Sequence, residues 1–308
     1  MSLNLSHVIL HQLRKSNEEL VINFRTDSLE HNTPTENLVA EIHKVFNAKA
    51  GKGFGCFKTD SEFFGYINTL VAKNSDSFVA SYNHPSRKIK SDKKIYNNYL
   101  AWNMENLMNA FSGAPGHQKS TNIGSYDEAN FTSQRWDPVT SKVGGVLDLL
   151  LDKGYDVYGS LAPSDYHNDK LDFSPCSFSK THLIVPSNDY DGVFKALKNG
   201  TYWGSQGGFL KQFHFSIETS PSKRALWPGE IGEVDKGELV LVEFNFVRSE
   251  SYDGLPLEVE ILTNCSTGKP EALDPIFIAS NVSRGAALLP INSKGLDAQS
   301  CYVRSRVK

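Results

Sequence analysis

Two short polar clusters each follow an apolar run that is typical of a β-strand. They are residues 83–87, Asn-His-Pro-Ser-Arg, and residues 164–168, Ser-Asp-Tyr-His-Asn. Imidazole and carboxylate groups at the carboxyl ends of parallel strands assemble metal and catalytic sites in many α/β barrels. Asp165 and His167 can place two ligands on one side of an extended segment, because alternate residues share a face. These clusters predict His84, Asp165 and His167 as candidate metal ligands.

Each of these residues also has a simpler interpretation. Asp165 and His167 could cap a loop, since such side chains often hydrogen-bond turns. His84 could be a buried, hydrogen-bonded histidine. His117 is a weaker ligand candidate, because the Gly-Ala-Pro-Gly turn before it needs no metal.

Bulk composition is that of an ordinary globular protein. The 308 residues are 39% hydrophobic and 22% charged, with a net charge of −3. This charge gives no overall attraction to nucleic acid or to an anionic membrane. No apolar run approaches the roughly 20 residues of a membrane span, and the first residues lack the pattern of a signal peptide. We therefore expect no membrane association.

The four cysteines, at positions 56, 176, 265 and 301, are scattered and lack C-x-x-C spacing. This scattered arrangement predicts neither a zinc knuckle nor a disulfide framework. We therefore expect a reduced protein of the cytoplasm, with the nucleoid as a possible place within it.

Hydrophobic periodicity predicts an α/β order of elements with a β-rich end. Two strands and a helix that begins at a capping box, Thr33-Pro34-Thr35-Glu36, form a ββα unit at the start. Residues 88–140 are polar and predict long loops with short helices. Further strands are expected at 77–82, 156–161, 181–185, 238–246, 257–262, 275–280 and 302–307, and helices at 143–151 and 189–198, the latter capped by Asn188 or Ser187.

The first sixty or so residues resemble the nucleoid-associated protein family of gammaproteobacteria. The matching segments are 1–3 (Met-Ser-Leu), 10–13 (Leu-His-Gln-Leu), 27–29 (Asp-Ser-Leu) and 38–43 (Leu-Val-Ala-Glu-Ile-His), and the likeness continues to about Phe63. Residues 1–63 hold seven Lys/Arg and eight Asp/Glu, a difference of −1. Since DNA-binding surfaces need a concentrated basic patch, the charge of this segment does not support nucleic-acid binding.

The rest of the chain resembles PHP-type (polymerase and histidinol phosphatase) metal-dependent phosphoesterases. The matching segments, in family order, are 74–78, 83–87, 113–118, 136–137, 144–145, 147–150, 164–167, 196–200 and 204–207. This resemblance implies a distorted (β/α)7 barrel with two or three metal ions (Mn, Fe or Zn). It implies metal ligands at His84, Asp165, His167 and His117, and substrate phosphate held by Arg87 or Lys180.

One departure from the PHP pattern is large. That family opens with a His-x-His pair, and none of the nine histidines here has another histidine two positions away. The metal cluster is therefore expected to be incomplete and activity reduced or absent. The N-terminal unit could instead supply His11 or His43 to rebuild the cluster.

We therefore expect three parts: a ββα unit (1–63), a partial, distorted PHP-type barrel lacking its first strands (64–220), and a β-rich appendage (221–308). The leading interpretation is an impaired PHP-type phosphoesterase acting on a phosphorylated small molecule or nucleotide. The alternative is a non-enzymatic nucleoid-associated or interaction protein. The substrate, the metal and the oligomeric state do not follow from the sequence.

Overall fold

The computed structural model describes only part of the chain. The described residues are 8–12, 78–87, 89–102, 108–114, 119, 126, 132–166, 168–175, 177–219, 224–235, 237–252, 254–292 and 301–308. The second strand and the helix predicted for the ββα unit lie outside them. The first of the two strands predicted for this unit is confirmed as β1, Val8–Gln12.

The first sheet contains the strands that carry the two polar clusters. Its order is β1-β2-β3-β4, in which β2, β3 and β4 run parallel and β1 is an antiparallel edge strand. The register pairs Asn83 with Ser112 and Ser112 with Leu161, so the three parallel strands end at one edge. The bounds are Phe78–Asn83 for β2, Met108–Ser112 for β3 and Tyr158–Leu161 for β4.

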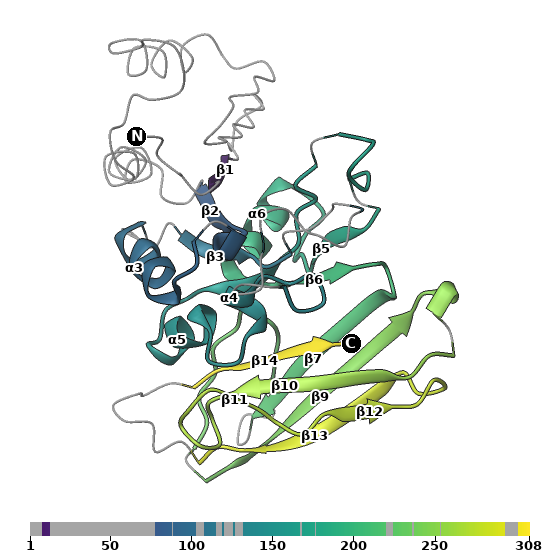
Figure 1. Ribbon diagram of the computed structural model, residues 1–308. Coiled ribbons are helices and arrows are strands. Elements are labelled where there is room, and N and C mark those ends of the chain that lie inside the picture. The colour runs from purple at the N-terminus through teal and green to yellow at the C-terminus, as the bar shows by residue number, and fades with distance from the viewer. Residues whose placement is uncertain are drawn as a thin grey trace, which may run out of the picture.

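Three helices cover one face of this sheet, as Figure 1 shows. They are α3 (Asp92–Trp102), α4 (Pro138–Ser141) and α5 (Val146–Asp152). Their apolar side chains share a core with those of β2 and β3; it includes Tyr82, Ile95, Tyr99, Met108, Phe111, Val139, Leu147 and Leu150. This face is therefore apolar and covered by helices. The polar residues that follow the strands lie at the carboxyl edge of the sheet.

A two-stranded sheet lies beside β4. It consists of β5 (Ser179–Leu183) and β6 (Tyr202–Gln206), joined through α6 (Tyr190–Asn199). The α6 helix begins at Asp189, whose side chain accepts a hydrogen bond from the Gly192 amide, and ends at Gly200. The predicted helix is confirmed, but its N-cap is Asp189, one residue after Asn188.

The C-terminal part is a β-sandwich of two sheets, shown in the lower half of Figure 1. One sheet has the order β13-β9-β7-β8, and the other has β11-β10-β12 with β14 paired to β10. Phenylalanines of β7 and β9 pack against Val259 and Ile261 of β10 in one core. The bounds are Leu210–Thr219 (β7), Arg224–Leu226 (β8), Leu239–Arg248 (β9), Leu257–Thr263 (β10), Glu271–Ala272 (β11), Ile276–Ile278 (β12), Arg284–Pro290 (β13) and Val303–Val307 (β14).

The boundary expected at residue 220 falls inside this sandwich, because β7 on one side of it pairs with β8 and β9 on the other. The described sheets are open, and none closes into a barrel. The PHP-type barrel stays a prediction, since segment 13–77 lies outside the described residues. Among the described helices, none has the length and apolar character needed to cross a membrane.

One expectation about the cysteines is wrong. Cys265 and Cys301 form a disulfide, although they are 36 residues apart in the sequence. Cys265 follows β10, Cys301 precedes β14, and these two strands are antiparallel neighbours. The pairing therefore arises from strand order and not from local spacing.

Candidate functional site

The turn after β2 presents the first polar cluster. β2 ends at Asn83, and Pro85–Arg87 form a single 3-10 turn in which the Arg87 amide donates to the His84 carbonyl at 3.0 Å. His84 has a φ of 30°, which is unusual for a residue with a side chain. His84 and Arg87 are both buried, with exposed fractions of 5% and 8%. The turn thus directs two nitrogen-bearing side chains into the protein.

A buried carboxylate holds this turn in place. Asp137 is fully buried and accepts hydrogen bonds from the Ser86 amide (3.1 Å), the Ser86 hydroxyl (2.7 Å) and the Val139 amide (2.9 Å). Tyr126 donates its hydroxyl proton to the same carboxylate. Burial raises the pKa of Asp137, and the bonds from Tyr126, Val139 and Ser86 oppose that rise. Asp137 therefore fixes the backbone between His84 and Arg87.

Asp165 joins the turn from the end of β4. Its Oδ2 lies 2.9 Å from the Arg87 Nη1 and 3.9 Å from the His84 Nε2. Its φ is 47°, so His84 and Asp165 are two of the four described non-glycine residues with positive φ. Such conformations cost energy and concentrate at functional sites. The structure therefore brings together three of the six residues singled out in the sequence.

The other three are not joined to this cluster. His117 and His167 lie outside the described residues. Lys180 lies in β5 of the two-stranded sheet, opposite Ser205. It lies close enough to His182 to lower that residue's pKa, although burial is the larger cause.

Asp137 and Tyr126 were not predicted as site residues. The signal for Asp137 was present in the sequence, because Asp followed by Pro138 is typical of an N-cap with proline at the first helical position. Tyr126 gave no such signal. Burial, followed by the charge of Asp137, raises its pKa well above the usual value, which keeps the phenol a hydrogen-bond donor.

The metal cluster implied by the PHP resemblance needs more ligands than this site provides. His84 and Asp165 offer one nitrogen and one carboxylate, and the cationic Arg87 already contacts that carboxylate. In the described part of the chain, no three His, Cys, Asp or Glu side chains are grouped so that they could hold a metal ion. The described residues alone therefore do not fit a divalent metal centre. What they do form is a buried arginine, oriented by a carboxylate and flanked by an imidazole.

Comparison with known proteins gives matches at the N-terminal end. The family described as nucleoid-associated protein YejK matches residues 9–96, under a third of the chain. A nucleoid-associated protein of Vibrio cholerae is 75% identical over 64 residues, 20% of this chain and 19% of that protein. One of Vibrio campbellii is 66% identical over 79 residues, 25% of this chain and 24% of that protein.

The N-terminal region is thus similar to the nucleoid-associated family, as the sequence predicted. The chain spans only about a fifth to a quarter of the length of these relatives. The family match extends past Phe63 and includes His84 and Arg87, whereas Asp165 lies beyond it. No solved structure matches the chain.

Proposed function

We propose that His84, Arg87 and Asp165 bind the phosphate group of a phosphorylated small molecule or nucleotide. The observation that carries this proposal is the Arg87–Asp165 ion pair beside His84 at the carboxyl edge of three parallel strands. Ligands of open α/β sheets bind outside the carboxyl ends of the strands. A guanidinium matches phosphate oxygens with parallel hydrogen bonds, and Asp165 orients it.

Titration calorimetry with inorganic phosphate tests this proposal. We expect Arg87→Met to weaken phosphate binding at least about tenfold, the loss of one charge-assisted hydrogen-bonded pair. Arg87→Lys should retain the charge but lose the bidentate geometry, and so bind with intermediate affinity. Lys142→Met is the matched control, because Lys142 is exposed and its ion pair with Asp92 lies on the surface. Equal affinities for Arg87→Met and the wild type would overturn the proposal.

Hydrolysis of a phosphate ester is the more specific form of this proposal, and it rests on the PHP resemblance. Bound divalent metal ions would supply an activated water. The two described donors are too few, so His117 and His167 would have to contribute. Mass spectrometry of the purified protein decides the matter. Two or more equivalents of manganese, iron or zinc, lost in His167→Ala, would support hydrolysis. Near-zero metal in both proteins would contradict it.

The comparisons favour a second function more strongly than the first. The relatives that match the N-terminal region are named nucleoid-associated proteins, and we propose that this region brings the chain to the nucleoid, within the cytoplasm. The matched segment ends in a basic stretch: Lys90, Lys93 and Lys94 are exposed at the start of α3. Exposed lysines of this kind neutralise DNA phosphates and release counterions.

DNA binding by the full chain at two salt concentrations tests this second function. Between about 50 and 200 mM salt, affinity should fall steeply, because the binding is electrostatic. The triple change of Lys90, Lys93 and Lys94 to Gln should reduce the salt slope by about three. Lys195→Gln, an exposed lysine of α6 outside the matched segment, is the control. No measurable DNA binding at low salt would refute this function and leave the phosphate proposal untouched.

A further inference from the structure

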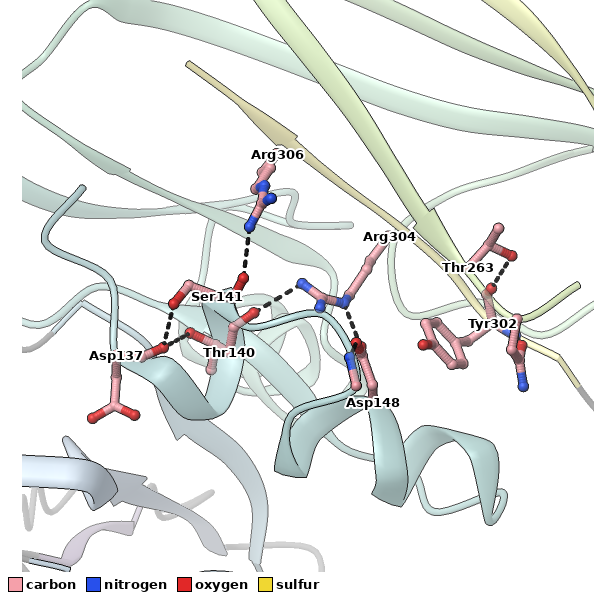
Figure 2. Close-up of polar contacts among 10 residues, drawn as sticks. Asp137, Thr140, Ser141, Asp148, Thr263, Tyr302, Arg304 and Arg306 are labelled. Atoms are coloured by element: carbon pink, nitrogen blue, oxygen red, sulfur yellow. Dashed lines mark hydrogen bonds and ion pairs between the residues drawn. The ribbon is translucent and has the colours of Figure 1, made fainter. Parts of the chain in front are cut away.

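The last strand of the chain contacts the helices that carry the candidate site. β14 is paired to β10 of the sandwich, and it lies next to α4 and α5 (Figure 1). Two of its arginines bond to these helices, and Arg306 also forms an ion pair with Glu260 of β10. Figure 2 shows both side chains reaching from the strand to the end of α4.

Arg304 makes the more buried of these connections. Its Nε lies 2.7 Å from Oδ1 of Asp148, a carboxylate with no exposed surface, and its Nη1 donates to the Thr140 carbonyl at 2.9 Å. Arg306 donates to the next carbonyl, that of Ser141, at 2.6 Å. Both arginines therefore bind the last carbonyls of α4, which have no partner within the helix.

The opposite end of α4 holds the candidate site. α4 has only four residues, and its N-cap is Asp137. The Asp137 carbonyl accepts hydrogen bonds from the Thr140 and Ser141 amides, while its carboxylate holds Ser86 between His84 and Arg87. Asp137 thus links the short α4 helix to the turn that carries Arg87, and we infer that a displacement of the C-terminal end of α4 also moves this turn.

A disulfide fixes the start of β14. Cys301 lies three residues before Arg304 and is bonded to Cys265, two residues after the end of β10. Tyr302, which follows Cys301, donates its amide to the Asn264 side chain at 2.9 Å. The Tyr302 carbonyl accepts a bond from the Thr263 hydroxyl at 2.7 Å (Figure 2). The disulfide and these hydrogen bonds therefore hold Cys301 and Tyr302, the two residues just before β14, against the end of β10.

We propose that Arg304 and Arg306 are positioning residues for the candidate phosphate site, and that the Cys265–Cys301 disulfide controls how firmly they hold α4. The affinity of the site for phosphate then depends on the oxidation state of this pair. The effect on phosphate affinity rests on the proposed function. The effect of the disulfide on α4, through Arg304 and Arg306, does not. In the cytoplasm, the location proposed above, a disulfide is usually redox-active rather than structural, which agrees with a regulatory role.

The redox step is an ordinary thiol–disulfide exchange with a dithiol. One thiolate attacks a sulfur of the disulfide and forms a mixed disulfide, and the second thiolate then releases both cysteines as thiols. The dithiol is oxidised to its own disulfide, and two electrons and two protons pass to the cysteines. Cys265 is buried and Cys301 half-buried, and both line a cavity of about 1490 Å³.

Hydrogen–deuterium exchange of the wild-type protein tests the coupling without any substitution. Oxidised and dithiothreitol-treated samples are compared, with the number of free thiols measured in each. We expect amide exchange to become at least several-fold faster after reduction in peptides that cover residues 137–148 and residue 86. Unchanged exchange in these peptides, in a sample whose thiols are fully reduced, would overturn the proposal.

Phosphate titration then tests the consequence for the site. We expect about five- to twentyfold weaker binding in Arg304→Met and in the reduced wild type, and partial recovery in Arg304→Lys. Arg284→Met, an exposed arginine of β13, is the matched control. Unaltered affinity in both Arg304→Met and the reduced protein would refute the positioning role. If the oxidised wild type binds no phosphate at all, the proposed function fails, while the exchange measurement still decides the coupling.

Discussion

At the scale of single residues, backbone strain and charge coincide at His84 and Asp165. Both have positive φ, their side chains lie 3.9 Å apart, and Asp165 also forms an ion pair with Arg87 at 2.9 Å. A non-glycine residue in this region costs about 1 kcal/mol or more. Such a conformation persists only where the surroundings enforce it, and here Asp137 and Arg87 provide the enforcing bonds. The positive φ of His84 and Asp165 therefore lowers the stability of the fold, which is typical of a functional site.

Replacing Asp165 by Asn separates its charge from its backbone conformation, since Asn also tolerates positive φ. We expect Asp165→Asn to lower the free energy of unfolding by about 2 kcal/mol, because Arg87 loses a charged partner in a poorly solvated place. Urea unfolding measures this change. Asp92→Asn is the control: its ion pair with Lys142 is similar in length, 3.1 Å, but exposed, so the loss should be under about 1 kcal/mol. Equal losses in the two variants would contradict the interpretation.

His182 gives the protein a pH-dependent contribution to stability. Burial, and then the charge of Lys180, lowers its pKa, while its Nε2 lies 2.9 Å from the Ser205 hydroxyl and its ring stacks on Trp203 at 3.8 Å. As the pH falls below about 6.5, His182 binds a proton in the unfolded chain before it does so in the folded protein. The free energy of unfolding therefore decreases as the pH is lowered. We expect the loss between pH 7.5 and 5.5 to be smaller in His182→Gln, measured by urea unfolding. An equal loss in both proteins would refute this, and exposed His214→Gln is the control.

The sequence could predict His84 and Asp165 as site residues, but not the hydrogen bonds to Asp137 that hold the turn between His84 and Arg87. His84 and Asp165 follow apolar runs, and that pattern indicates strand ends without knowledge of the fold. The bonds that Asp137 makes to Ser86 span 51 residues of sequence. Nothing local to either residue encodes such a contact. Residue types at strand ends are therefore predictable, whereas the partners that orient them are a tertiary property.

At the scale of elements, burial on one face or on both did not decide which strands the sequence predicted. β4, β9 and β10 were anticipated from their composition. β3 was missed, because all five of its residues are buried and its sequence, Met-Asn-Ala-Phe-Ser, alternates neither in polarity nor in size. β7 was also missed, although buried Phe213 and Phe215 flank exposed His214 in the alternation expected of a half-buried strand.

The end of α6 gives a prediction at this scale. Gly200 has a φ of 70°, and a Cβ there would lie 2.1 Å from the Tyr158 ring. Gly208 has a φ of 67° with nothing within 4 Å of the same position. Gly208→Ala should therefore cost about 1 kcal/mol from backbone strain alone. Gly200→Ala should cost about 1–3 kcal/mol more, because the Tyr158 ring must move. Thermal and urea unfolding compare the two, and equal costs would show that the ring adapts freely.

At the scale of the whole molecule, sequence and structure differ in what connects the parts. The sequence predicted three consecutive parts, whereas β14, at the very end of the chain, binds helices of the α/β part. Composition and periodicity describe segments one at a time and carry no information on which segments become neighbours. The same holds for the disulfide, whose cysteines show no paired spacing. Long-range connections therefore had to come from the structure.

The disulfide gives the last prediction, because its effect on stability follows from the chain it closes. A link across 36 residues removes conformational freedom from the unfolded chain worth about 4 kcal/mol at most. We expect dithiothreitol to lower the free energy of unfolding of the wild type by about 3–4 kcal/mol in urea. The double variant Cys265→Ser, Cys301→Ser should have the free energy of unfolding of the reduced wild type, and dithiothreitol should not change it. In the double variant Cys56→Ser, Cys176→Ser, dithiothreitol should lower the free energy of unfolding as much as it does in the wild type. A wild type that is equally stable with and without reductant would contradict this loop-closure contribution.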